Sequence, residues 1–192
     1  MKFMPVIVSL GFLFSSCGVA KEKPLQENAE KDSVQALAKN PSQAGWLMII
    51  KAYEDSMHQS LELDPRLGKV AIKAYTDYQQ AYWKDTLAAD FLFKAAEIAD
   101  NLNDPKKAIA LFQQCHDQYL VFPFRAECLF RIGNIYDYKL NDYTSAKEYY
   151  KDVIKFFPKS PMVKNAEAAI QNLGKSDTDL IREFEKKNGV KR

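Results

Sequence analysis

The clearest indication of the fold is the stretch AECLFRIGNIYDYKLNDYTSAKEYYKDVIKFFPK, residues 126–159. Apolar residues recur at helical spacing in its first half and again in its second half, with the polar turn 140–143 between them. Gly133 and Ala146 are small, which lets two helices approach closely while large aromatic side chains fill the space beside them. The stretch therefore predicts a hairpin of two packed helices.

A similar pattern precedes this stretch. The corresponding positions hold Leu92, Ala95, Ala96 and Ala99 in the first helix and Ala108, Phe112 and Cys115 in the second. An acid or serine stands directly before proline at 64–65, 104–105 and 160–161, which is typical of a helix start. Only 7 glycines and 8 prolines occur in 192 residues, which disfavours many short strands joined by tight turns.

The sequence thus predicts an all-α domain over residues 43–190. About eight helices are expected, near 43–62, 66–83, 87–102, 105–121, 124–140, 143–156, 161–173 and 177–188. The last of them is polar, follows Gly174 and Ser176, and is expected to cap the end of the stack.

The order and spacing of these residues resemble the tetratricopeptide repeat, with one additional residue placed in the turn at 140–143. The resemblance covers residues 89–160 well and 43–175 more loosely. It implies a solenoid of stacked helical hairpins, in which each unit covers the apolar face of its neighbour. In that family the first helices of successive units line a concave face, which binds protein partners.

By this register the concave face presents acids, amides and aromatic side chains as a partner-binding groove. Its expected residues are Asp90, Phe93, Glu97, Asp100 and Asn101 from one unit and Glu127, Phe130, Asn134, Asp137 and Tyr138 from the next. The two phenylalanines stand at equivalent positions and are expected to act as apolar anchors for the partner. The alternative is that the groove positions are ordinary solvent-facing ones and that both rings belong to the core.

Residues 1–16 have the features of a secretory signal peptide, with an early positive charge and an apolar run too short to span a bilayer. Residues 13–17 resemble the lipobox of bacterial lipoproteins, in which the cysteine becomes the lipidated first residue. The resemblance implies a lipid attached to Cys17. Residues 17–42 contain no aromatic side chain and are expected to form a flexible tether. Gly18 stands where some lipoproteins carry an inner-membrane retention aspartate, so we expect a place on the outer membrane, facing the periplasm.

A lipobox followed by tyrosine-rich helical repeats is similar to the periplasmic tetratricopeptide lipoproteins, a group that includes a component of the outer-membrane β-barrel assembly machine. Within the tether, Asp32-Ser33-Val34 resembles a short acceptor motif for bacterial O-glycosylation. Ser33 is therefore a candidate glycosylation site.

Composition argues against several other functions. The 27 Lys and Arg residues balance 25 Asp and Glu residues, for a net charge of +2, so no one-signed field exists to attract nucleic acid. The two histidines, His58 and His116, lack further ligands at metal-binding spacing, and no phosphate loop or nucleophile elbow is present. We expect no metal, no cofactor and no catalytic residues. The sequence leaves open whether Cys115 and Cys128 form a disulfide.

These observations favour a membrane-tethered periplasmic adaptor that binds a segment of another envelope protein through the concave face, with no nucleic-acid partner. A self-associating structural module of the cell envelope is the alternative, and an enzyme of unfamiliar type is a third, less favoured reading. The sequence leaves the oligomeric state and the identity of the partner open.

Overall fold

A computed structural model of the chain describes residues 41–58 and 63–189. Over this part the protein is all-helical. Its helices are α2 (Gln43–His58), α3 (Pro65–Ala81), α4 (Thr86–Asn101), α5 (Pro105–Gln118), α6 (Arg125–Asn134), the π-helical turn η1 (Ile135–Lys139), α7 (Tyr143–Phe156), α8 (Met162–Asn172) and α9 (Asp177–Lys187). The predicted signal peptide, Cys17, Ser33, most of the tether and the end of the first expected helix lie outside the described residues.

Short side-chain caps set where the helices begin. The carboxylate of Asp64 accepts a hydrogen bond from the backbone N–H of Arg66, and Asp104 accepts one from Lys107. In both cases the next residue is a proline at the first helical position, where no N–H is required. These two predicted helix starts are confirmed, and α8 begins one residue later than expected, at Met162.

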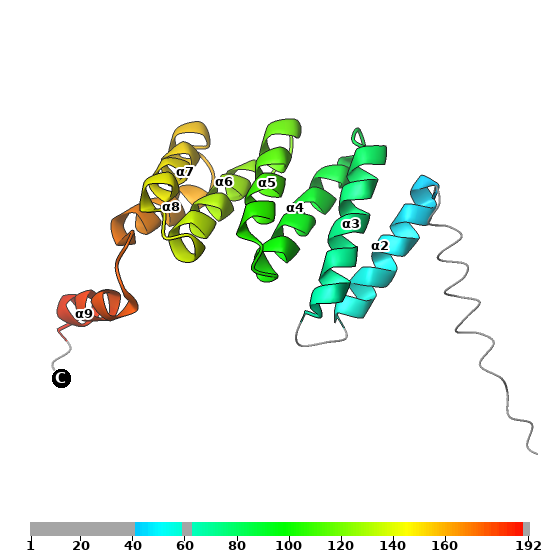
Figure 1. Cartoon of the computed structure of the whole chain (residues 1–192). Helices are drawn as coiled ribbons and strands as arrows, with labels where there is room; N and C mark the ends of the chain where they lie inside the picture. Colours follow the sequence, from blue (N-terminus) through cyan, green and yellow to red (C-terminus); the bar gives the residue numbers. More distant parts are fainter. Residues whose placement is uncertain (1–40, 59–62, 190–192) are drawn as a thin grey trace, which may run out of the picture. The chain divides into compact units, whose positions relative to one another are not determined.

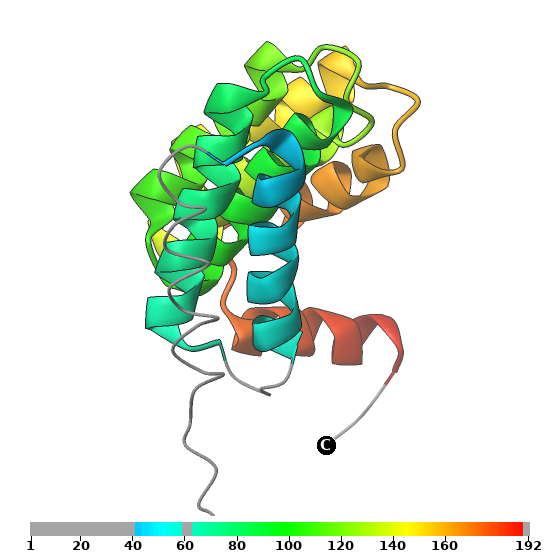
Figure 2. The ribbon, with the colours of Figure 1, turned by 90° about the vertical axis from the view of Figure 1, so that its right-hand side faces the viewer.

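The helices pack in sequence order, each against the next one, from α2 to α8 (Figure 1). Figure 2 looks from the α2 end, with α2 and α3 in front and the later helices behind them. This arrangement follows from the sequence because each hairpin has an apolar face that only a neighbouring hairpin can bury.

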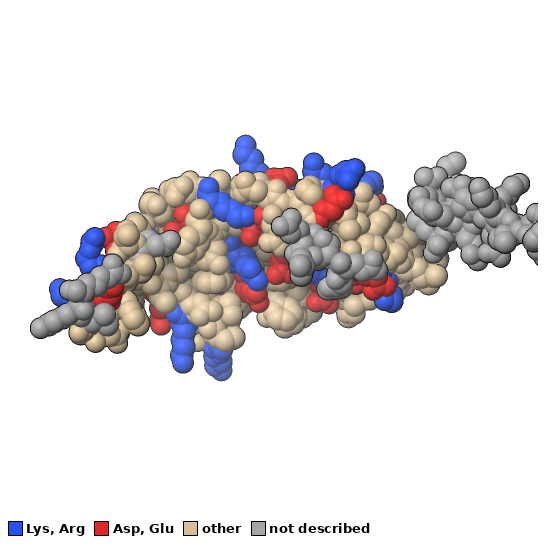
Figure 3. Space-filling model, turned by 90° about the horizontal axis from the view of Figure 1, so that it is seen from below, with Lys and Arg blue, Asp and Glu red and all other residues tan. Residues whose placement is uncertain are grey.

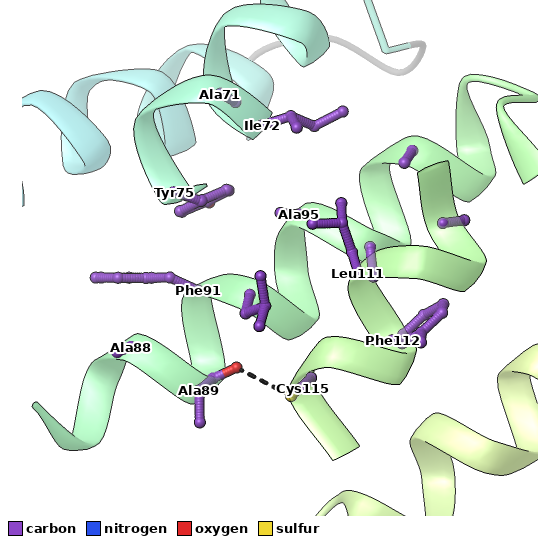
Figure 4. Packing of buried hydrophobic residues seen from close by; sticks show 14 of the residues in the cluster. Ala71, Ile72, Tyr75, Ala88, Ala89, Phe91, Ala95, Leu111, Phe112 and Cys115 are labelled. Atoms are coloured by element: carbon purple, nitrogen blue, oxygen red, sulfur yellow. Dashed lines mark hydrogen bonds between the residues drawn. The ribbon is translucent and has the colours of Figure 1, made fainter. Parts of the chain in front are cut away.

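The buried core of this stack forms two clusters, and the half-buried Tyr136 and Tyr149 pack against both of them. Tyr78, Phe112 and Tyr150 are among its largest fully buried side chains. Small residues alternate with them, and Figure 4 shows Ala88, Ala89 and Ala95 of α4 beside the larger side chains of α3 and α5. Alanines at these positions let the helices approach while the aromatic rings fill the remaining space.

Gly133 lets helix α6 approach the Tyr150 ring of α7 very closely. A Cβ atom at Gly133 would lie 2.5 Å from Cε1 of Tyr150, so only glycine fits against this ring. The Tyr150 hydroxyl donates to Oδ1 of Asn134 at 2.9 Å. The ring of Tyr150 is thus held in place both by packing and by hydrogen bonding.

The additional residue of the second unit lies in the π turn η1 and not in the following turn, where we expected it. Both hairpins turn through the same three residues, Leu-Asn-Asp, and Asn103 and Asn141 both adopt positive φ, 58° and 52°. Because the two turns are alike, the insertion must precede them. The Leu140 N–H donates to the Ile135 carbonyl at 3.1 Å. This hydrogen bond reaches back five residues instead of four, so this turn of the helix holds one additional residue.

Helix α9 lies where the sequence predicted a terminal helix, but it contributes no residue to the buried core. Its apolar side chains Ile181 and Phe184 are half exposed or more. Ser176 caps its first turn by accepting from the Asp179 N–H at 3.2 Å. The helix is therefore present as predicted, while its expected role as a cap that buries the end of the stack stays a prediction.

Candidate protein-binding surfaces

A hollow of about 360 Å³ lies among the first helices of successive hairpins, and we call it the central hollow. It is lined by Glu54, Met57, Tyr75, Lys94, Glu97, Ile98, Asp100, Asn101, Phe112 and Arg131. Helices α2, α4 and α6 supply most of these side chains. This is the surface on which the repeat register placed the partner-binding groove.

Ion pairs connect the helices around the central hollow. Lys94 Nζ of α4 lies 2.6 Å from Oε1 of Glu54 in α2. Arg131 of α6 places its guanidinium 3.1 Å from Glu97 in α4. Since each pair joins a helix to the corresponding helix of the neighbouring hairpin, the pairs fix the relative register of the hairpins, although partly exposed pairs of this kind add little stability.

A third pair joins Lys139 in the π turn to Asp100, with 2.7 Å between Nζ and Oδ1. The acids of this face are therefore neutralised by cations of the next helix. Burial raises the pKa of Glu97, and the nearby charge of Arg131 opposes that shift. The charges of the central hollow are thus already compensated, and its acids are less available to a basic partner than the sequence suggested.

The structure brings together only some of the predicted groove residues. Glu97, Asp100 and Asn101 line the central hollow, and Glu127 contacts Arg131 beside it at 3.2 Å. Tyr138 is exposed, with 73% of its surface accessible.

The two predicted anchors do not stand free. The Phe93 ring packs against Phe112 and Phe122, with ring centres 5.3 and 6.0 Å apart. The Phe130 ring packs against Tyr150 at 5.6 Å. Both are half-buried, so each ring belongs in part to the core and only its remaining surface is open to a partner.

The placement of Asp137 on the groove was wrong. Asp137 is 6% exposed, and its carboxylate accepts from the buried Tyr150 hydroxyl at 3.3 Å. Burial raises the pKa of this carboxyl group. The cause of the misplacement is the additional residue of the π turn, which shifts the repeat register at Asp137. Asp137 therefore takes the position that Ala99 holds in the preceding unit, and the Ala99 side chain is fully buried.

A second, larger hollow of about 1090 Å³ lies beside the loops that lead into α4 and α6, and we call it the edge groove. Its lining residues are Gln79, Gln80, Trp83, Lys84, Asp85, Thr86, Ala89, Asp90, Gln114, Gln118, Tyr119, Leu120, Val121, Phe122 and Pro123. Asp90 is the one predicted groove residue among them. Sequence reasoning missed this groove, although the apolar run at 119–124 is unusual for a loop and was a usable signal.

The described part of the chain holds no cluster of three potential metal ligands, and no helix in it combines the length and hydrophobicity that spanning a bilayer requires. The ring of His116 packs against Phe157, and its Nδ1 lies 3.2 Å from the Arg125 carbonyl oxygen. Charged side chains of both signs are interspersed over the face seen in Figure 3.

Cys115 and Cys128 are free, buried thiols on the adjacent helices α5 and α6. Cys115 Sγ donates to the Ala89 carbonyl at 3.5 Å, which ties α5 to α4 (Figure 4). A hydrogen bond with Cys115, together with burial, raises the pKa of the Cys128 thiol. Both cysteines are therefore packed core side chains, and the raised pKa favours the protonated form of Cys128.

These hairpins coincide with two matches to a known family. Residues 90–119, which span most of α4 and all of α5, and residues 127–160, which span most of α6 and all of α7, match the tetratricopeptide repeat. A comparison with curated proteins gives no significant match. The chain is a tetratricopeptide repeat-containing protein, and repeats of this class serve in general as scaffolds for protein–protein interaction.

Proposed function

We propose that this protein is a membrane-tethered scaffold of the bacterial cell envelope, which holds a segment of another envelope protein on the face around the central hollow. The observation that carries the proposal is the pair of matched repeats, whose first helices line an open hollow with Glu97 and Asn101 of α4 and Arg131 of α6.

The tether is the second part of the proposal. The lipobox-like residues 13–17 support lipid attachment at Cys17, and the following residues up to 42 provide a spacer before α2. A flexible spacer of this length reaches on the order of 30 Å, enough to hold the helical domain clear of a membrane surface. We place the anchor in the outer membrane with the domain in the periplasm.

Photo-crosslinking in cells tests the binding surface. A photoreactive amino acid at Asn101, which is exposed in the central hollow, is expected to capture a discrete partner protein. The same group at Ala110, which is exposed on α5 and does not line the hollow, is the matched control and is expected to capture much less. Equal capture at both positions would remove this face as the binding surface, and capture of a second copy alone would favour the self-associating module.

Detergent phase separation tests the tether. The native protein is expected in the detergent phase and the Cys17→Ala variant in the aqueous phase or as an unprocessed precursor, because the acyl chains provide the only anchor in this reading. An intact mass of the native protein reports the lipid and any glycan on Ser33 together. Native protein that partitions entirely into the aqueous phase would contradict lipidation.

A further inference from the structure

The edge groove has the size and composition of a site for a polypeptide segment. Its volume of about 1090 Å³ is about three times that of the central hollow. Pockets for small molecules and cofactors usually measure about 300–1000 Å³. A groove above that range, bordered by the ends of α3 and α5 and by two loops, fits a longer ligand better than a compact one.

The rim of the groove exposes large apolar side chains. Trp83 is 60% exposed, Leu120 69% and Val121 97%, while Phe122 below them is buried. Large apolar surface at the border of a hollow favours a binding site, because covering it removes it from water. A large apolar side chain of a ligand would be covered from both sides, by the indole of Trp83 and by the 120–121 loop.

One wall of the groove is a network of amide groups. Gln79 is 5% exposed, and its Nε2 donates to Gln118 Oε1 at 3.1 Å and to the Tyr119 hydroxyl at 3.0 Å. Gln114 Nε2 in turn donates to Gln79 Oε1 at 3.3 Å. These bonds hold the wall rigid before any ligand arrives, which lowers the entropy lost on binding.

Hydrogen-bond donors remain at the rim of this wall. Within the described residues, the backbone N–H groups of Leu120 and Val121 and the Nε2 of Gln118 donate to no protein acceptor. An extended peptide presents carbonyl oxygens at regular intervals, and such donors can bind them. The donors beside the amide wall therefore favour binding of the ligand's backbone, whereas the apolar rim favours one large apolar side chain of the ligand.

The charges of the groove favour a basic ligand. Lys84 lies over the Trp83 ring at 5.0 Å from its centre. Asp85 caps α4 and accepts from the Tyr78 hydroxyl and from Gln43. Asp90 has no ion pair or hydrogen bond from its carboxylate to another described residue, so a cation of the ligand would supply its missing partner.

We propose that the edge groove binds an extended segment of a partner protein that carries one large apolar side chain and, close to it, one basic side chain. This inference rests on the proposed scaffold function and gives it a second binding surface, separate from the central hollow. The apolar side chain lies between Trp83 and Val121, the backbone lies along the amide wall, and the basic side chain pairs with Asp90.

A random ten-residue peptide library displayed on phage, selected on the full chain carrying Cys17→Ala, tests the proposal. Enriched peptides are expected to share a large apolar residue with a nearby Lys or Arg. Labelled synthetic copies, measured by fluorescence polarisation, are expected to bind at least about tenfold more weakly to Val121→Asp and to Trp83→Ala, because the two side chains form the central apolar contact. Asp90→Asn is expected to remove most of the preference for a basic peptide over its glutamine-substituted copy.

Phe156→Ala is the matched control, because Phe156 is an exposed aromatic residue outside both the edge groove and the central hollow, and it is expected to leave peptide binding unchanged. All of these side chains are partly or largely exposed, and thermal unfolding of each variant checks that the fold is intact. The proposal is overturned if no selected peptide binds, if Val121→Asp binds equally well, or if sedimentation shows a dimer that Val121→Asp abolishes, since a second copy would then fill the groove.

The outcome is separable from that of the scaffold proposal. Crosslinks from position 101 without peptide binding at the groove would retain the scaffold function and refute the second surface. Peptide binding that depends on Val121 without crosslinks from position 101 would support the edge groove and refute the central hollow as the binding face.

Discussion

Replacing Gly133 by alanine tests whether the close approach of α6 and α7 is fixed by the Tyr150 ring. The new Cβ would lie 2.5 Å from Cε1 and 2.7 Å from Cδ1 of Tyr150, and the fully buried ring cannot move into solvent. Overpacking a core by one methyl group costs about 1–3 kcal/mol, and we expect the upper end here because the Tyr150 hydroxyl is also held by hydrogen bonds.

Helix propensity offsets part of this cost, since alanine is favoured over glycine inside a helix by about 1 kcal/mol. The net destabilisation of Gly133→Ala is then about 2 kcal/mol, which lowers Tm by roughly 4–8 °C for a domain of this size. Circular dichroism at 222 nm during thermal unfolding, with urea unfolding in parallel, measures both quantities.

Gly68→Ala is the matched control. A Cβ at Gly68 would meet Leu102 Cδ1 at 3.0 Å, which is the end of a flexible side chain and can give way. Gly68→Ala therefore keeps part of the stabilisation that alanine gives over glycine in a helix. We expect its free energy of unfolding to stay within about 1 kcal/mol of that of the original protein. If Gly133→Ala were as stable as the original protein, or if both variants lost the same stability, the Tyr150 ring would not be the determinant of this contact.

Two further predictions concern titratable groups. The thiols of Cys115 and Cys128 should resist iodoacetamide in the folded Cys17→Ala protein and both react in urea, because burial protects them; the loss of both reactive thiols in unfolded, unreduced protein would indicate a disulfide between them. The side chain and backbone of Ser145 lower the pKa of Asp142 at the start of α7, so this carboxylate stabilises the fold above its ordinary pKa and loses that contribution as the pH falls below about 4. Thermal unfolding between pH 7 and pH 2 should show a smaller acid-induced loss in Asp142→Asn, which keeps the cap without titrating; an equal loss would show that this cap does not contribute.

The helix boundaries were predictable because they depend on local chemistry. An aspartate before proline satisfies the first backbone N–H groups whatever the tertiary context, and Asp64 and Asp104 do this as expected. The repeated Leu-Asn-Asp turn is equally local, since asparagine tolerates the left-handed backbone that Asn103 and Asn141 adopt. Tertiary packing is not needed to place these ends.

The face around the central hollow was only partly predictable, because the π turn changes the repeat register along it. Residues before the turn keep the spacing between units that the sequence suggests, so Glu97 falls at the central hollow. Within the turn the register changes by one position, which carries Asp137 into the core. The repeated Leu-Asn-Asp triplet places the insertion before residue 140, but the sequence does not show at which residue of the helix the register changes.

The edge groove was not predictable from helical periodicity at all. It forms where the loop at 82–85 meets the loop at 119–123 and the ends of two helices. Its rigid wall depends on Gln79 contacting Gln118 and Tyr119, about 40 positions away in sequence. Periodicity reports which face of one helix is apolar, whereas a groove between loops depends on how separate hairpins are stacked.

The π turn also sets the limits within which parts of this protein can be exchanged. A designer who transplants the inner-face residues of one hairpin onto the other must count 37 positions forward from residues before the turn, as from Ala96 to Gly133. After the turn the count is 38, as from Ala108 to Ala146. A chimera joined inside residues 135–139 would rotate every later side chain of the helix by about 100°. Workable exchange boundaries therefore lie before residue 135 or after residue 139. Equivalent positions are 37 residues apart before the turn and 38 residues apart after it.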